Sequence, residues 1–281
     1  MTTVDPALAP TGSPVMAPGD EFEKVHRSAM AWAVRDSITI AWRNLLNIVR
    51  VPQLLVFSTI QPVIFVLMFR YVFGGAIQVP GGSYVNYLMP GIFVQTVAFG
   101  ATNTAIGLAE DIHKGLIERF RSLPMARSAV LAGRTLADLV RDFLVIILMV
   151  IVGMIVGFRV QTNFIAFCAG IGVLLLFAFA MAWVFAIIGM SSSSAESAQA
   201  ASFPILAVLV FASSAFVPVS TMPSWLQVWA NHQPVSITVN AVRALMIGGP
   251  TATPVIQSLA WSVGLIAVFA PMAVRRYRRA G

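Results

Sequence analysis

Six long apolar runs divide the chain, and polar or proline-rich stretches separate them. An apolar run of roughly 17 to 25 residues can cross the hydrocarbon core of a bilayer as an α-helix. The pattern predicts an all-α protein with six transmembrane helices, at Leu54–Phe73, Asn86–Ala109, Leu139–Phe158, Phe164–Gly189, Phe203–Ser220 and Pro254–Val274. The fifth is expected to be short or bent, because Pro218 lies near its end and Pro223 follows closely.

The composition supports a membrane location and excludes a soluble enzyme as the main interpretation. Hydrophobic residues make up 58% of the 281 positions and charged residues only 10%. A soluble domain carries roughly 25% charged residues, so this chain could not cover a water-facing surface.

The basic residues predict the orientation in the membrane. The net charge is +7, and all but three of the 18 lysines and arginines fall in the N-terminal segment, the second-to-third connection or the C-terminal tail. The exceptions are Arg70, Arg159 and Arg243. The positive-inside rule therefore predicts a multi-pass protein of the plasma membrane with both termini in the cytoplasm. Because the basic residues flank apolar spans instead of forming one compact face, no nucleic-acid partner is predicted.

The N-terminal part divides into two segments before the first span. Residues 1–20 are expected to be a disordered tail, since they contain four prolines and no apolar core. Residues 21–52 are expected to form a cytoplasmic interfacial helix ahead of the six-helix domain, 53–281. On its wheel, Arg35, Arg43 and Arg50 share one face and Trp42 lies opposite, which is typical of a helix in the lipid headgroup layer.

Two connections between spans also carry information. Residues 110–138 form the only long loop dense in both charges, which makes them the natural surface for a soluble partner. Residues 221–253 are too apolar for a water-exposed loop, and Trp225 and Trp229 lie one turn apart. We expect short extracellular helices there that dip into the outer leaflet, with the tryptophans at the interface.

No motif predicts chemistry on this chain. Neither Lys24 nor Lys114 follows a glycine, so a phosphate-binding P-loop is absent and no ATP site is expected. The histidines are far apart and no metal or cofactor is predicted. The serines 191–194 are interpreted as a polar turn instead of a protease nucleophile.

The interior of every predicted span is free of ionisable residues, and Glu196 at a span edge is read as a cap or loop contact. A proton-driven transporter usually keeps an ionisable carrier in the membrane, so energy from outside the chain is favoured. The same absence suits an apolar or lipid-like cargo. Gly153 and Gly157 form a GxxxG pair that is expected to let helices pack closely.

Two stretches carry a family resemblance. In residues 115–141, the family pattern is matched in order by Gly115, Glu118, Arg119, Leu123, Pro124, Arg127 and Gly133. In residues 231–249 it is matched by Asn231, Pro234 and Arg243. With this topology, the chain resembles the membrane subunit of type-2 ABC exporters, nearest to the daunorubicin-resistance branch that exports drugs and lipids. The resemblance runs from about Trp32 to the C-terminus.

The resemblance implies a transport subunit that has no ATP site of its own. ATP and Mg²⁺ would bind a separate ATP-binding subunit, and a second permease, identical or different, would pair with this chain in the lipid membrane. The coupling residues would be Lys114, Gly115, Ile117, Glu118, Arg119, Phe120, Leu123, Pro124 and Arg127. An extracellular gate region would include Trp225, Trp229, Asn231, Pro234 and Arg243. Substrate-contacting residues stay unassigned.

The leading hypothesis is thus an ATP-driven exporter permease for an amphipathic drug or lipid-like compound. A stand-alone secondary transporter is the alternative, followed by an intramembrane protease or a structural membrane anchor. A transport requirement for a proton gradient instead of ATP would favour the first of these alternatives.

Overall fold

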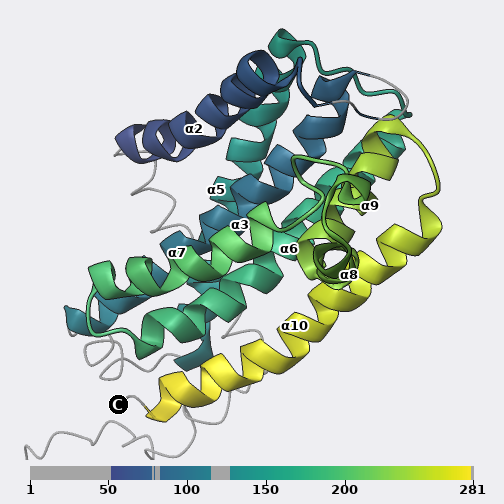
Figure 1. Ribbon diagram of the computed structural model, residues 1–281. Helices are drawn as coiled ribbons and strands as arrows, with labels where there is room; N and C mark the ends of the chain where they lie inside the picture. Colours follow the sequence, from purple (N-terminus) through teal and green to yellow (C-terminus); the bar gives the residue numbers. More distant parts are fainter. Residues whose placement is uncertain (1–51, 78, 80–82, 115–126, 280–281) are drawn as a thin grey trace, which may run out of the picture.

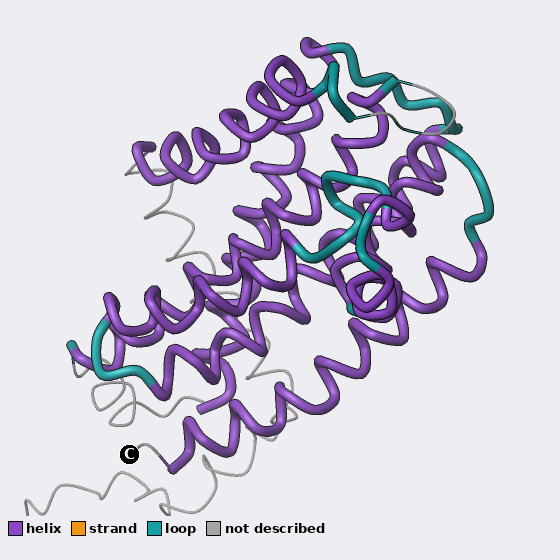
Figure 2. Tube along the Cα trace, in the orientation of Figure 1, coloured by secondary structure: helices purple, strands orange, loops and turns teal. Residues whose placement is uncertain are grey.

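The computed structural model describes residues 52–77, 79, 83–114 and 127–279, and every regular element in those ranges is a helix (Figures 1 and 2). The long helices run side by side in one bundle. In chain order the elements are α2 Pro52–Leu67, a π-helical end η2 Met68–Phe73, α3 Tyr84–His113, α5 Arg127–Val156, α6 Phe164–Ser191, α7 Ala195–Phe211, the 3-10 turn η3 Val219–Thr221, α8 Ser224–His232, α9 Pro234–Ile247 and α10 Ala252–Arg279.

Four of the described helices are long and apolar enough to cross a membrane. They are α3, the Arg134–Val156 part of α5, α6, and the Ala252–Tyr277 part of α10. They coincide with the second, third, fourth and sixth predicted spans. An all-helical membrane protein is therefore confirmed, whereas six spans remain a prediction, because α2 with η2, α7 and α9 count only as shorter apolar helices.

The fifth predicted span ends earlier than expected. α7 stops at Phe211, nine residues before the predicted end at Ser220. The Ser213 hydroxyl donates to the Val210 carbonyl oxygen at 2.5 Å, and it also accepts from the Ala215 amide at 3.1 Å. Local side-chain bonds of this kind offer the backbone an alternative to the helical ladder, so the chain turns away after one more residue.

The third predicted span begins much earlier than expected. α5 starts at Arg127 and not at Leu139, so Arg141 and Asp142 lie well inside the helix instead of in its first turn. The helix is therefore longer than the predicted span, and its charged residues precede a uniformly apolar part that begins at Phe143. The residues between Arg127 and Leu139 look like a loop in sequence because they mix charged and small side chains, although none of them breaks a helix.

The GxxxG prediction in α5 is only half right. Gly153 does sit at a close approach, since a Cβ there would lie 2.6 Å from Cε of Met89 on α3. Gly157, in contrast, adopts a φ of 109° just after the last residue of α5. Glycine tolerates that left-handed conformation, so Gly157 ends the helix instead of packing against a neighbour.

The core of the bundle is built around α3. Its buried side chains pack mainly against α6 and α7, and α6 in turn packs against α9 and α10. The predicted short helices after residue 221 are present as α8 and α9. α9 does more than touch a surface, because Val235, Val239, Val242 and Met246 are completely buried in the core.

One end of the bundle gathers the ends of several helices. Leu108 of α3, Met190 of α6 and Tyr277 of α10 share a small buried cluster there. The turn between α6 and α7 lies at the same end, where Ser194 and Ser197 form a reciprocal capping box at the start of α7 (Figure 1). Lys114 directly follows α3 and Arg275 lies near the end of α10, so both are at this end. We call it the charged end below.

Candidate functional site

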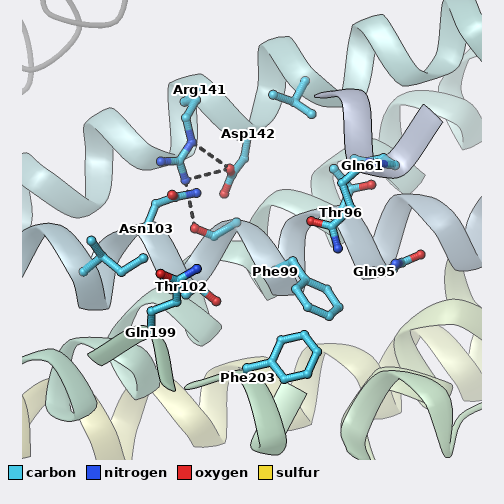
Figure 3. Close-up of a pocket in the computed structure, with 14 residues that line it drawn as sticks. Gln61, Gln95, Thr96, Phe99, Thr102, Asn103, Arg141, Asp142, Gln199 and Phe203 are labelled. Atoms are coloured by element: carbon cyan, nitrogen blue, oxygen red, sulfur yellow. Dashed lines mark hydrogen bonds and ion pairs between the residues drawn. The ribbon is translucent and has the colours of Figure 1, made fainter. Parts of the chain in front are cut away.

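A cavity of about 400 Å³ opens between α2, α3, α5 and α7 (Figure 3). Figure 3 shows Arg141 and Asp142 of α5 on one side and Gln199 and Phe203 of α7 on the other. The wall is unusually polar for a bundle of apolar helices. Its lining residues are Gln61, Pro62, Gln95, Thr96, Phe99, Gly100, Thr102, Asn103, Ile106, Arg141, Asp142, Val145, Gln199 and Phe203.

Three charged side chains of α5 form a buried cluster beside this cavity. Arg141 bridges two carboxylates: its Nη1 lies 3.1 Å from Oδ1 of Asp138 and its Nη2 lies 3.1 Å from Oδ1 of Asp142. The same Nη2 donates to the carbonyl oxygen of Gly100 at 3.0 Å. Thr104 donates its hydroxyl to the other oxygen of Asp138 at 2.5 Å. All three charged side chains are at least 87% buried.

The cluster lies deep in the bundle. Asp142 is fifteen residues into α5, which corresponds to about 22 Å along the helix. Buried charges are expensive unless they are paired, and here one guanidinium serves two carboxylates. Sequence reasoning counted Arg141 among the charges of the cytoplasmic loop and missed the cluster, because it began the helix too late.

Two further polar atoms at the cavity have no hydrogen-bond partner among the described residues. They are Oε1 of Gln95 and Oγ1 of Thr102, both buried. Thr96, next along the wall, is satisfied, because its hydroxyl donates to the Ile92 carbonyl oxygen at 2.7 Å. A buried polar group without a partner costs about 1–3 kcal/mol. Such groups in an interior cavity are typical of a place that receives a ligand or water.

Aromatic and aliphatic side chains provide the apolar part of the wall. The rings of Phe99 and Phe203 lie 6.3 Å apart between centroids and are tilted by 60°. Phe203 is 58% exposed, so the cavity opens to the surroundings beside it. Ile106 and Val145 complete the apolar surface. The cavity can therefore hold a molecule that has both an apolar body and a polar group.

The predicted coupling loop lies largely outside the described residues. Gly115, Ile117, Glu118, Arg119, Phe120, Leu123 and Pro124 fall in that gap. Lys114, at its edge, forms an ion pair with Glu110 at 2.9 Å, and Arg127 is the first residue of α5. Arg134 of α5 pairs with Asp111 of α3, which ties together the two helices that the loop connects. The interfacial residues Arg35, Trp42, Arg43 and Arg50 also lie outside the described ranges.

At the opposite end, the predicted gate residues separate into two groups. Arg243 of α9 lies inside the bundle, with its guanidinium 3.8 Å from the centroid of the Tyr87 ring on α3. It donates to the carbonyl oxygen of Ser214 at 2.9 Å and to Oδ1 of Asn240 at 2.9 Å. These contacts join α9 to α3 and to the turn after α7.

The other gate residues do not take part in this network. Trp225 and Trp229 lie on α8 and are 72% and 45% exposed, so they face the surroundings as an interfacial pair would. Asn231 is exposed near the end of α8, and Pro234 is the first residue of α9, where its fixed φ suits a helix start. Within the described ranges, no group of three or more His, Cys, Asp or Glu side chains could hold a metal ion.

Comparison with known proteins shows which family has this sequence. The model of the ABC-2 type transporter family matches residues 36–247. The chain is 37% identical to the daunorubicin resistance ABC transporter permease protein DrrB1 of Streptomyces coeruleorubidus. This alignment spans 252 residues and covers 90% of this chain and 89% of that protein. It is 29% identical to the probable doxorubicin resistance ABC transporter permease protein DrrC of Mycobacterium tuberculosis H37Rv, over 79% of this chain and 81% of that one. It is also 23% identical to the putative transport permease ycf38 of Cyanophora paradoxa, over 75% and 74%. The resemblance drawn from residues 115–141 and 231–249 is thereby confirmed.

Proposed function

Because the chain belongs to the ABC-2 type transporter family, we propose that it carries an amphipathic compound across the membrane as the permease subunit of an ATP-driven exporter. Its relatives are named as permease proteins for daunorubicin and doxorubicin resistance, and a drug of this kind is the cargo that we propose first. ATP would be hydrolysed on a separate ATP-binding subunit, as the word permease in those names implies. A secondary transporter is not favoured by these relatives.

The cavity between α2, α3, α5 and α7 is the proposed cargo site. The single observation that carries this proposal is a ligand-sized space, about 400 Å³, whose wall combines buried unsatisfied polar atoms with the rings of Phe99 and Phe203. Ligand sites are commonly of roughly 300–1,000 Å³ and place a few polar groups on a mostly apolar wall. Because Phe203 is exposed, cargo could enter the cavity sideways from the lipid.

Helix α5 is the proposed connection between ATP hydrolysis and the cavity. It begins at the end of the proposed coupling segment, residues 114–127, and continues without a break past Asp142. Arg134 and Asp111 hold α5 against α3 near the charged end. A push on the loop would therefore move α3 and α5, two of the four helices that line the cavity, since a helix transmits displacement along its axis as a rigid body.

The assembly follows from the same proposal. Two permeases, identical or different, would face each other so that two cavities share one pathway, and each would contact one ATP-binding subunit. Both termini would lie in the cytoplasm of a cell whose plasma membrane contains the exporter. The gathering of Lys114, Arg275 and Arg276 at one end of the bundle supports this orientation.

Inside-out membrane vesicles provide the test. Vesicles that contain the chain and its ATP-binding partner should accumulate daunorubicin, followed by its fluorescence, when ATP is added and not when a non-hydrolysable analogue replaces it. Vesicles that contain the partner alone are the control. Accumulation that needs a proton gradient and proceeds without ATP would contradict the proposal.

A further inference from the structure

The charges beside the cavity do not balance. Arg141 supplies one positive charge, and it is shared by the carboxylates of Asp138 and Asp142. The nearest other cations toward the charged end, Arg134 and Lys114, are engaged in their own ion pairs with acidic partners on α3. Within the described part of the chain, the cluster therefore keeps a surplus of one negative charge.

The surplus negative charge lies on the carboxylate that faces the cavity, that of Asp142. Asp138 points elsewhere, because its two oxygens are taken by Arg141 and by the hydroxyl of Thr104. Asp142 lines the cavity, and Arg141 contacts only its Oδ1. A carboxylate whose side chain is 91% buried is stable only with a compensating positive charge or a proton. A cationic ligand in the cavity would supply that charge.

A second observation points the same way. Oε1 of Gln95 is a hydrogen-bond acceptor, it is buried at the wall of the same cavity, and it has no partner among the described residues. The whole residue is only 2% exposed. An unpaired acceptor calls for a donor such as the N–H of an amine. A protonated amine would therefore satisfy both the carboxylate of Asp142 and the amide oxygen of Gln95.

The remaining wall fits the body of such a ligand. Phe99 and Phe203 present ring surfaces that bind apolar groups and also attract cations through their π-electrons. A purely apolar cargo would leave the surplus negative charge of the cluster without a counter-charge and Oε1 of Gln95 without a donor.

We propose that Asp142 is a specificity-determining residue that selects a positively charged amphiphile, with the cationic group of the cargo at Asp142 and its apolar body against Phe99 and Phe203. The inference rests on the proposed function in taking this cavity as the cargo site. It narrows the substrate class from drugs and lipids in general to amphipathic cations.

Two ions of nearly the same shape and opposite charge test this selection. The purified chain is placed in nanodiscs of zwitterionic phosphatidylcholine, and equilibrium binding of tetraphenylphosphonium and of tetraphenylborate is measured, with binding to empty nanodiscs subtracted. We expect the phosphonium to bind more tightly. Asp142→Asn should weaken phosphonium binding about tenfold, equal to about 1.4 kcal/mol, and should leave the borate unaffected or tighter.

Two more variants keep the test decisive. Glu196→Gln removes one negative charge from an exposed position outside the cavity and should leave both affinities unchanged. Asn103→Lys adds a positive charge at an exposed position of the cavity wall while Asp142 stays in place, so it should also weaken phosphonium binding. If Asp142→Asn fails to fold, this variant still tests whether the phosphonium binds in the cavity, and the comparison of the two ions tests the charge selection.

Equal affinity for the two ions, or phosphonium binding that neither variant alters, would overturn the inference. The second result would mean that the phosphonium does not bind beside Asp142 in this cavity. Because no ATP or partner subunit is present, the outcome is independent of the vesicle assay. Charge selection by the protein in nanodiscs without ATP-driven transport would refute the proposed function, while the preference of the cavity for cations would stand. ATP-driven transport without charge selection would refute the inference and leave the proposed function standing.

Discussion

Replacing Gln95 by leucine should make the empty protein more stable and the transporter less active. Oε1 of Gln95 is buried without a partner among the described residues, and leaving such an atom unsatisfied costs about 1–3 kcal/mol. Leucine has a similar size and no polar atom, so Gln95→Leu should recover about 1 kcal/mol of that cost after allowance for imperfect packing. For a chain of this size, the gain corresponds to a rise in Tm of about 2–4 °C.

The matched control is Thr96→Val, at the next position along α3. Its hydroxyl already donates to the Ile92 carbonyl oxygen, so removing it recovers no unsatisfied group and should not raise Tm. Thermal unfolding in nanodiscs and ATP-driven daunorubicin accumulation in vesicles are measured on the same preparations. Gln95→Leu should unfold at a higher temperature and transport at a lower rate. A gain in stability with a loss of activity is expected when a buried polar group serves function. A lower Tm with unchanged transport would refute the reasoning.

Three further changes have defined outcomes. Arg141→Gln leaves two buried carboxylates without their cation and should lower the free energy of unfolding by about 3–5 kcal/mol, measured as a fall in Tm or as loss of folded protein; wild-type Tm would contradict the pairing. Glu118→Ala should leave the ATPase rate of the complex near the wild-type value while export falls, and normal export would show that the coupling assignment is wrong. Arg243→Lys removes the planar fork that donates to three oxygens, those of Tyr87, Ser214 and Asn240, and packs on the Tyr87 ring. It should lower Tm by a few degrees, about 1–2 kcal/mol, and an unchanged Tm would contradict a structural role for this network.

The helices that the sequence predicted best are those with long uniform apolar runs. α6 begins at Phe164 as predicted, because Asn163 caps it by accepting from the Ala166 amide at 2.8 Å. α3 and α10 extend only a few residues past their predicted limits. Such runs are read correctly because burial in lipid or protein demands apolar side chains at every turn.

The errors came from boundaries where local chemistry decides. The charged start of α5 resembles a loop in sequence, and its contacts with α3, such as the ion pair of Arg134 with Asp111, identify it as part of the bundle. The early end of α7 depends on the hydrogen bonds of Ser213, which hydropathy does not register. The first boundary depends on contacts with another helix, and the second on hydrogen bonds to residues two or three positions away.

The cavity could not be predicted from any motif. Its polar residues come from four helices, and Gln61 and Gln199 are far apart in sequence. The one available signal was the presence of uncharged polar side chains such as Gln95 inside otherwise apolar runs. Each could equally have been a helix-packing contact, and only the structure shows that they share one space. The coupling residues from Gly115 to Pro124 stay a prediction.

The most direct test of the central claim is to purify the tagged chain from its native membranes in mild detergent and to identify its stoichiometric partners by mass spectrometry. The account predicts one ATP-binding subunit for each permease, and the same sample would show whether the second permease is identical or different. If the chain were recovered alone and no ATP-binding subunit associated with it after reconstitution, the account of an ATP-driven exporter would be contradicted.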